Sequence, residues 1–186
     1  SRLYDPQSLT LPANRNKDLE RRPWWHKASL EGKPQLTDPT MLKFRAEGSR
    51  VPDQSDLQLA HMTANYYGMI SLIDHNVGRI LTCVQSLGLE QDTHVVFTTD
   101  HGEWLGDHGL LFKGPYHVDS LMRLPMVWRP AASAGVDPAV VSTPVGILDL
   151  APTFCEIAGL PVPEWMDGHP LRRPTTRRPR RVATPW

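Results

Sequence analysis

The feature that most constrains the fold of this chain is a long amphipathic pattern that ends at a glycine and is followed by a short apolar run. Ser55 and Gln58 stand three positions apart, which is the signature of a capping box at a helix start. Gly88 is typical of a helix end. Between these limits apolar residues recur at helical spacing, at Leu59, Met62, Tyr66, Met69, Ile73, Val77, Ile80, Val84 and Leu87. The pattern predicts one helix of about nine turns with a single apolar stripe.

Short strands and a second helix are predicted after it. The run 94–99 shows no alternation of apolar and polar residues, so we expect a strand buried on both faces in a mostly parallel sheet. The run 125–130 is strand-like but bracketed by proline, which places it near a sheet edge or keeps it short. Asp149 is expected to cap a helix that runs to about Ala158, with Gly159 closing it. Helices alternating with strands are typical of an α/β fold.

The candidate chemistry lies directly after the first predicted strand. Asp100 and His101 are adjacent there, and at a strand end, where the chain turns, both side chains can face one ion. A carboxylate oxygen and an imidazole nitrogen suit Mg, Mn, Ca or Zn, and the pair does not select among them. An isolated Asp-His pair is more often a turn with a capping interaction. Gly102, a second Asp-His-Gly at 107–109 and Lys113 in the same loop favour the metal site.

Two further side chains of this loop are candidates. Lys113 is a point charge on a flexible stem, suited to hold an oxygen of a sulfuryl or phosphoryl group while charge moves onto the leaving oxygen. The alternative is a solvated lysine before a Gly-Pro turn. For His108 two interpretations remain open, namely a third polar contact or packing of the glycine-rich turn. We expect Asp100 and His101 to lie side by side at the C-terminal end of a strand, with Lys113 alongside.

This arrangement resembles the sulfatases of the alkaline phosphatase superfamily, and most closely the branch of arylsulfatases, choline sulfatases and phosphonate monoester hydrolases. In that branch a strand ends in Asp-His-Gly, a Gly-Asp-His-Gly turn follows, and a Lys stands thirteen residues after the Asp, which is the spacing of Asp100 and Lys113. The resemblance extends over roughly 55–171 and, more weakly, over 4–12. It implies an α/β chain with a partial alkaline-phosphatase-like fold, a mostly parallel sheet flanked by helices and a missing N-terminal part.

The resemblance also implies roles for individual residues. Asp100 and His101 would hold a divalent metal (Ca, Mg or Mn), and Lys113 would be the catalytic residue that contacts the sulfate. The nucleophile of sulfatases is a formylglycine made from a Cys-x-Pro/Ala-x-Arg motif far upstream of the Asp-His pair. Neither Cys83 nor Cys155 stands in such a motif, so formylglycine is expected only in the missing upstream part.

The chain is therefore interpreted as the C-terminal portion of a metal-dependent sulfuric ester hydrolase, inactive in isolation, whose substrate is a small-molecule sulfate or phosphate-type ester. One alternative is a phosphonate monoester or phosphodiester hydrolase of the same superfamily. A second alternative is a non-catalytic remnant of a truncated sulfatase gene.

Composition divides the chain into three parts. Residues 1–53 hold several prolines and little periodicity, which predicts an irregular segment that covers the main body. Residues 54–171 are predicted to form the C-terminal part of the sulfatase α/β domain. Residues 172–186 carry six Arg and no acid, although the whole chain balances 20 basic against 20 acidic residues. Interspersed prolines favour a solvated, disordered tail there, so no nucleic-acid partner is expected.

No apolar run approaches the roughly 18 residues that cross a bilayer, and no charged-then-apolar signal opens the chain. A soluble chain without a membrane partner is therefore expected. The sequence does not indicate the compartment or the oligomeric state.

Overall fold

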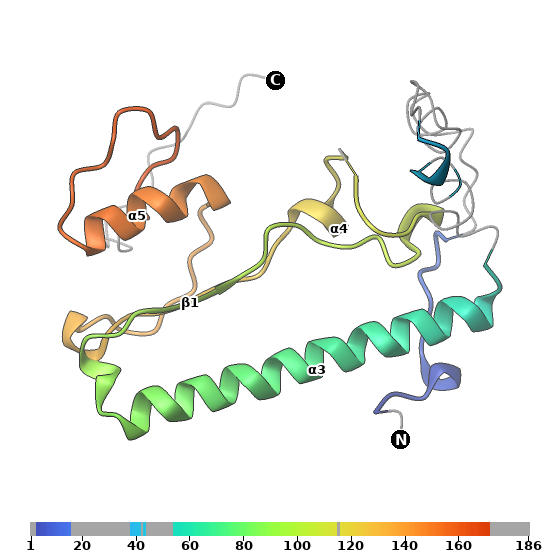
Figure 1. Cartoon of the computed structure of the whole chain (residues 1–186), viewed down its shortest axis with the longest axis horizontal. Coiled ribbons are helices and arrows are strands. Elements are labelled where there is room, and N and C mark those ends of the chain that lie inside the picture. The colour runs from blue at the N-terminus through green and yellow to red at the C-terminus, as the bar shows by residue number, and fades with distance from the viewer. Residues whose placement is uncertain (1–2, 16–37, 42, 44–53, 115, 172–186) are drawn as a thin grey trace. The chain divides into compact units, whose positions relative to one another are not determined.

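The computed structural model describes residues 3–15, 38–41, 43, 54–114 and 116–171 (Figure 1). Much of the segment predicted at 1–53 and all of the tail predicted at 172–186 lie outside these residues, so the limits of the three predicted parts stay predictions. The chain divides into two compact units, residues 1–135 and 136–186. Each unit is described by itself.

The long helix of the first unit is α3, Asp56–Ser86, and its start and end are as predicted (Figure 1). The Ser55 hydroxyl accepts a hydrogen bond from the Gln58 amide N–H at 3.2 Å, and the Gln58 side chain accepts one from the Ser55 N–H at 2.8 Å. These two bonds are the predicted capping box. Gly88, with φ of 68°, turns the chain out of the helix.

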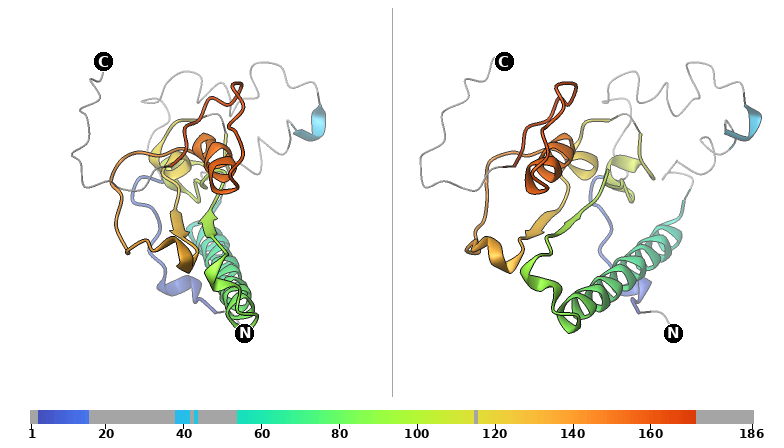
Figure 2. Two further views of the ribbon diagram at one scale, coloured as in Figure 1. Left: turned by 90° about the vertical axis from the view of Figure 1, so that its left-hand side faces the viewer. Right: turned by 60° about the vertical axis from the view of Figure 1, so that its left-hand side comes forward.

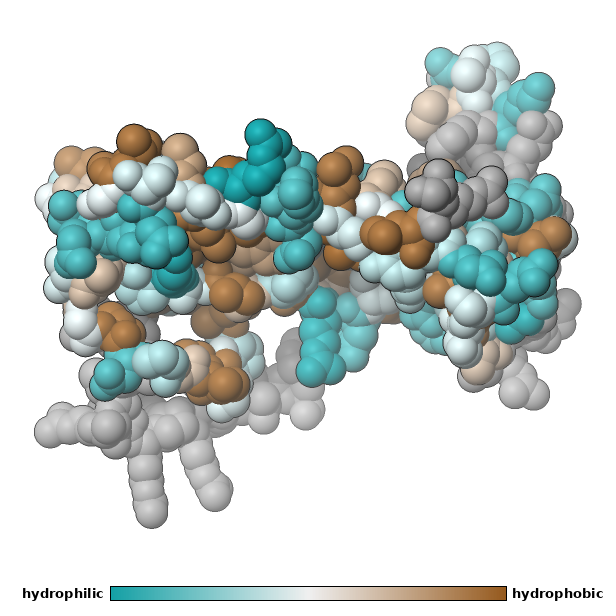
Figure 3. Space-filling model, turned by 90° about the horizontal axis from the view of Figure 1, so that it is seen from below, coloured by the Kyte–Doolittle hydropathy of each residue, from teal (hydrophilic) through white to brown (hydrophobic). Residues whose placement is uncertain are grey.

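The single apolar stripe that the pattern of α3 predicts is buried only near the start of the helix. The buried residues all lie in the first turns, at Leu59, Ala60, Thr63 and Ala64. Farther along, Met69, Ile73 and Ile80 are 54%, 52% and 61% exposed. Figure 3, viewed from the α3 side, shows apolar side chains among polar ones along this helix. Beyond the first turns these apolar side chains are largely exposed, although the ring of Tyr67 meets that of Tyr4 edge to face, with the ring centres 5.6 Å apart.

The sheet of the described residues consists of β1, Val95–Thr98, and β2, Met126–Arg129. A short 3-10 turn, Leu89–Gln91, folds the chain back from the end of α3 into β1 (Figures 1 and 2). Both predicted strands are confirmed, but they pair antiparallel, with Val95 opposite Arg129 and Thr98 opposite Met126.

The described residues therefore contain no parallel pair, and the expected burial of β1 on both faces is wrong. Phe97 is 42% exposed, and Val127, its partner on β2, is 62% exposed. A strand is buried on both faces only when other layers cover both sides of its sheet, and two strands alone do not provide that.

The loop between β1 and β2 forms most of the core of this unit. It contains the 3-10 turn Asp107–Gly109 and the short helix α4, Asp119–Met122. Four of its side chains pack together and are almost fully buried: Trp104, Leu110, Tyr116 and Leu121. A second cluster joins Leu111 of the loop to Leu59 of α3. The loop that follows the Asp-His pair is thus packed on its own apolar residues and on Leu59.

The second unit contains α5, Leu150–Ile157, preceded by a 3-10 turn. Asp149 stands at its N-cap as predicted, but its carboxylate accepts the backbone N–H groups of Gly146 at 2.8 Å and His169 at 2.9 Å rather than one inside α5. Gly159, with φ of 68°, closes the helix as expected. Asp149 therefore ties the chain before α5 to the segment around His169.

Within the described ranges, no helix combines the length and the apolar character that a bilayer crossing demands.

Candidate functional site

The end of β1 turns the side chains of Asp100 and His101 toward each other. The Thr99 hydroxyl donates to the His101 carbonyl oxygen at 3.2 Å, and the His101 N–H donates to Asp100 Oδ1 at 3.0 Å. In this turn Asp100 Oδ2 lies 3.5 Å from His101 Nε2. The expected placement of the pair at the C-terminal end of a strand is therefore found, while its role in metal binding stays a prediction.

The hydrogen bonds of His101 indicate which ring nitrogen carries the proton. Nδ1 lies 2.8 Å from the carbonyl oxygen of Gly102, and a carbonyl only accepts, so Nδ1 carries the hydrogen. In the neutral ring Nε2 then has a free lone pair. The ammonium group of Lys113 donates to this lone pair at 2.5 Å. Lys113 thus lies beside His101 as expected, and the Nε2 lone pair already binds a cation.

Asp100 is ionised at neutral pH. Its own backbone N–H is the main cause that lowers the pKa of the carboxyl below the ordinary value. Desolvation, the second cause, acts in the opposite direction, and the neighbouring His101 and the Thr99 hydroxyl lower the pKa further. Its side chain is 79% exposed, so the negative charge faces solvent. A solvent-facing carboxylate next to an unprotonated ring nitrogen that accepts from an ammonium group is a suitable start for a cation site.

The loop returns Lys113 to His101 through a short ladder of backbone hydrogen bonds. The Trp104 N–H donates to the Phe112 carbonyl, and the Gly106 N–H donates to the Leu110 carbonyl, both at 2.9 Å. Phe112 directly precedes Lys113 and has a left-handed backbone with φ of 64°. Gly102 is required at the base of the loop, because a Cβ there would overlap the carbonyl oxygen of Ser120.

The contacts of His108 are those expected from its packing in the glycine-rich turn, while its role as a third polar contact stays a prediction. Its ring meets the Trp104 ring edge to face, with the ring centres 5.7 Å apart. Its Nδ1 lies 3.1 Å from Asn14 Nδ2, and its N–H donates to Asn14 Oδ1 at 3.2 Å. Sequence reasoning missed Asn14 because it stands 94 residues away and no local pattern marks it.

The donor set of this site fits a divalent metal in kind. Asp100 and His101 supply the oxygen and nitrogen donors that Ca, Mg, Mn or Zn accept, and the Nδ1–H bond to Gly102 is the usual second contact of a metal-binding histidine. Among the described residues, no group of three or more His, Cys, Asp or Glu side chains surrounds a common point. Other ligands of an ion held here would have to be water or groups beyond these two side chains.

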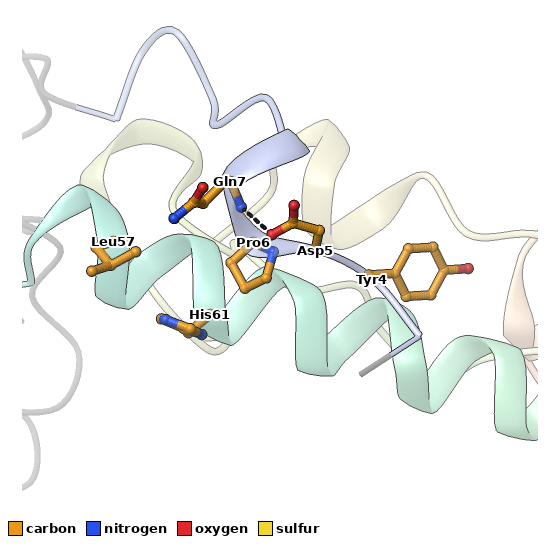
Figure 4. Close-up of a pocket in the computed structure, with 6 residues that line it drawn as sticks. All are labelled: Tyr4, Asp5, Pro6, Gln7, Leu57 and His61. Carbon is orange, nitrogen blue, oxygen red and sulfur yellow. Dashed lines mark hydrogen bonds between the residues drawn. The ribbon is translucent and has the colours of Figure 1, made fainter. Parts of the chain in front are cut away.

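A cavity of about 320 Å³ lies elsewhere in the same unit, between the N-terminal segment and the start of α3 (Figure 4). Six residues line it: Tyr4, Asp5, Pro6, Gln7, Leu57 and His61. The Gln7 N–H donates to the Asp5 carboxylate at 3.0 Å on its wall. None of Asp100, His101 or Lys113 borders this cavity, so it offers no substrate pocket for them.

Comparison with known proteins identifies the family. The family model described as Sulfatase matches residues 12–160, which is most of the chain and includes the Asp-His pair and Lys113. The chain belongs to the sulfatase family. The resemblance inferred from the Asp-His-Gly and Gly-Asp-His-Gly motifs is thereby confirmed.

Individual relatives agree with this assignment. Arylsulfatase K of Bos taurus is 32% identical over 63% of this chain and 21% of its own length. A choline-sulfatase of Rhizobium meliloti is 34% identical over 55% of this chain and 20% of its own length. This sulfatase-family chain thus spans about a fifth of the length of these curated relatives.

The fold class is confirmed by a solved structure. The phosphonate monoester hydrolase of Agrobacterium radiobacter is 36% identical, with a TM-score of 0.58 over 64% of this chain and 23% of its own. The predicted partial α/β fold of the alkaline phosphatase superfamily therefore holds, although the described part of this sulfatase-family chain contains only an antiparallel strand pair.

Proposed function

We propose that this chain takes part in the hydrolysis of sulfuric esters of small molecules, with Asp100 and His101 as metal ligands and Lys113 as the group that contacts the sulfate. The observation that supports this most directly is the meeting of three side chains at the end of β1. Asp100 Oδ2, His101 Nε2 and Lys113 Nζ form one continuous cluster, with separations of 3.5 Å and 2.5 Å along it.

Each side chain has a distinct task in this proposal. Asp100 contributes a fixed negative charge, because its depressed pKa keeps it ionised through the neutral range. His101 contributes the Nε2 lone pair, which the bond from Nδ1 to Gly102 keeps unprotonated. A divalent ion of the kind these donors suit, Ca, Mg or Mn, would supply Lewis-acid polarisation of an ester oxygen. Lys113 balances charge that develops on the leaving oxygen.

Lys113 serves this task only after it leaves His101. One lone pair cannot bind an ammonium group and a metal ion together, so a metal ion held at Nε2 would displace Lys113. The side chain has a flexible four-carbon stem and lies at the exposed surface, so it can swing toward the anionic part of a substrate.

We do not expect the chain to turn over substrate by itself. Formylglycine forms in a Cys-x-Pro/Ala-x-Arg motif, and Cys83 on α3 and Cys155 on α5 stand in other sequences. A metal held by two protein groups also binds weakly, because water must fill most of its coordination shell. The expected result is no metal-dependent hydrolysis of an aryl sulfate by the purified chain, and saturable hydrolysis would contradict this.

Metal binding tests the proposal directly. Manganese is paramagnetic, so even weak Mn²⁺ binding broadens NMR signals of nearby nuclei, and we expect selective broadening at residues 99–102. Asp100→Ala should remove it. Asp92→Ala is the matched control, because it deletes an exposed carboxylate just before the other end of β1 and should leave the broadening intact. Equal loss in both variants, or broadening spread over all exposed acids, would refute the site.

A second candidate function is phosphonate monoester hydrolysis. It is favoured by the 36% identity to the phosphonate monoester hydrolase of Agrobacterium radiobacter. A sulfate and a phosphonate monoester both present anionic oxygens to a lysine and a metal. A panel of aryl sulfates and phosphonate monoesters, assayed on a full-length relative that contains the same Asp-His-Gly and Lys spacing, distinguishes the two.

A further inference from the structure

The segment 11–15, here called the N-terminal strap, lies against the loop that carries Lys113. Its contacts reach three places. Leu11 packs against the cluster of Leu59 and Leu111. Arg15 forms two hydrogen bonds with the carboxylate of Asp56 at the start of α3, at 3.0 and 2.6 Å. Between them, Asn14 holds His108 by both its backbone and its ring.

The turn at 106–109, which Asn14 contacts, has a conformation that needs support from outside. Gly106, His108 and Gly109 all have positive φ, of 93°, 56° and 72°. Glycine adopts such values freely, but histidine pays roughly 1–2 kcal/mol for a left-handed backbone. The strap also approaches closely, because a Cβ at Gly109 would lie 2.7 Å from the Arg15 carbonyl oxygen.

The two contacts of Asn14 determine each other's chemistry. The His108 N–H must donate, so the amide atom it meets is the acceptor Oδ1. The other amide atom is then Nδ2, which donates to His108 Nδ1. The ring hydrogen is therefore on Nε2, which faces the Asp107 carboxylate at 3.7 Å. One asparagine thus fixes both the backbone of the turn and the orientation of the ring.

The turn at 106–109, held in this conformation, sets the position of Lys113. The Gly106 N–H binds the Leu110 carbonyl and the Trp104 N–H binds the Phe112 carbonyl, so the two sides of the loop run together up to Lys113. Leu110 and Leu111 are each 3% exposed and lock this register. Because these two backbone hydrogen bonds connect the turn at 106–109 to the residue before Lys113, we expect a change in the turn to displace Lys113.

We propose that Asn14 is a positioning residue for Lys113, acting through His108 and the turn at 106–109. It touches neither of the proposed metal ligands. The catalytic value of this positioning rests on the proposed function, but the positioning itself can be measured without metal or substrate.

The experiment uses the full chain with ¹⁵N-labelled histidine, at one fixed pH above 7 and without metal. The ring nitrogen shifts of His101 report its hydrogen bond from Lys113, and Lys113→Ala provides the reference for its loss. In Asn14→Ala we expect His108 to lose its single ring form and the His101 Nε2 signal to move in the direction seen in Lys113→Ala. Gln7→Ala, in the same N-terminal segment but in the wall of the cavity beside the start of α3, should leave both histidines unchanged.

Asn14→Asp is a more specific test, because it separates the effect on the His108 ring from the effect on Lys113. A carboxylate still accepts from the His108 N–H, but it cannot donate to Nδ1, so the ring must place its hydrogen on Nδ1 instead. We expect the His108 tautomer to switch while the His101 signals stay as in the wild type. Should Asn14→Ala fail to fold, Asn14→Gln keeps the amide but displaces it by one methylene, and the His101 signals should again move.

The proposal is overturned when a folded Asn14→Ala or Asn14→Gln chain changes the His108 signals and leaves those of His101 unaltered, since Asn14 would then support only the local turn. Absence of Mn²⁺ binding would count against the proposed function alone. The two failures are therefore distinguishable.

Discussion

The chain contains the tripeptide Asp-His-Gly twice, at 100–102 and at 107–109, and the structure uses the two copies in opposite ways. In the first copy the Asp and His side chains are 79% and 38% exposed. In the second they are 30% and 28% exposed. The first copy presents its polar atoms outward, whereas the second directs them into the fold.

The two histidines also carry their hydrogen on different nitrogens. His101 bonds through Nδ1–H to the Gly102 carbonyl, which leaves Nε2 for a cation. His108 receives the Asn14 amide at Nδ1, which places the hydrogen on Nε2. Identical residues thus acquire different chemistry because their backbone positions offer them different partners. A histidine in a motif becomes a ligand candidate only through what its second nitrogen contacts.

The largest expected difference between the two copies is in metal binding. His101→Ala should abolish the selective Mn²⁺ broadening at residues 99–102, because it removes one of two protein donors. His108→Ala should leave that broadening in place, although it weakens the turn. NMR titration of both variants provides the measurement, and loss of broadening in His108→Ala alone would reverse the assignment of the two copies.

Substitutions of Gly102 and Gly109, the glycines of the two copies, should differ in their effect on stability. Gly102→Ala places a Cβ on the carbonyl oxygen of Ser120, a backbone atom that cannot yield, and we expect a loss of about 3 kcal/mol or more in the free energy of unfolding. Gly109→Ala brings a left-handed residue to 2.7 Å from the Arg15 carbonyl, with an expected loss of about 2 kcal/mol.

Gly78→Ala is the control for both, because its Cβ on α3 would meet no atom within 4 Å. We expect it to raise the free energy of unfolding by about 0.5–1 kcal/mol through helix propensity. Urea unfolding measures the free energy of unfolding of the three variants and so ranks them. A larger loss of unfolding free energy in Gly109→Ala than in Gly102→Ala would show that the second Asp-His-Gly copy is the more closely packed of the two.

Lys113 offers a smaller test of the first copy. Since the ammonium group and a metal ion compete for His101 Nε2, Lys113→Ala should strengthen Mn²⁺ binding in this chain. Two unit charges about 4 Å apart in water interact by about 1 kcal/mol and Mn²⁺ carries two, so we expect at least about a fivefold lower dissociation constant. Weaker binding in Lys113→Ala, measured by the same titration, would show that Lys113 supports the metal site rather than competing with it.

The carboxylate of Asp149, which binds backbone groups instead of facing solvent like that of Asp100, provides the last comparison. Here we expect the smallest effect. Asp149 uses both oxygens on backbone N–H groups, and the bond from Gly146, followed by that from His169, lowers its pKa below the ordinary value. A depressed folded pKa gives stability that is complete above the unfolded pKa of about 3.9 and is lost as pH falls through the folded pKa.

Below pH 4 we therefore expect the amides of residues 146–171 in the wild type to lose protection, measured as the exchange rate relative to the intrinsic rate at the same pH. Asp149→Asn should show faster exchange already at neutral pH and little further change on acidification. Identical acid profiles for the two chains would show that the Asp149 bonds do not hold the segment around His169.

Local patterns in the sequence determined much of this protein. The capping box at Ser55 and Gln58, the turn at Gly88 and the two short strands depend on neighbours within a few residues, and all were predicted. The meeting of Asp100, His101 and Lys113 could also be expected, because a strand end and a glycine-rich loop of thirteen residues bring them together within one segment.

The tertiary structure decided what depends on partners far away in the chain. Neither the antiparallel pairing of β1 with β2 nor the exposure of the later turns of α3 follows from periodicity, because periodicity reports which face is apolar and not what covers it. The different roles of His101 and His108 were likewise decided by contact, since Asn14 reaches His108 across 94 residues. A tripeptide specifies its donor atoms, and only the packed chain determines which of them remain free to bind.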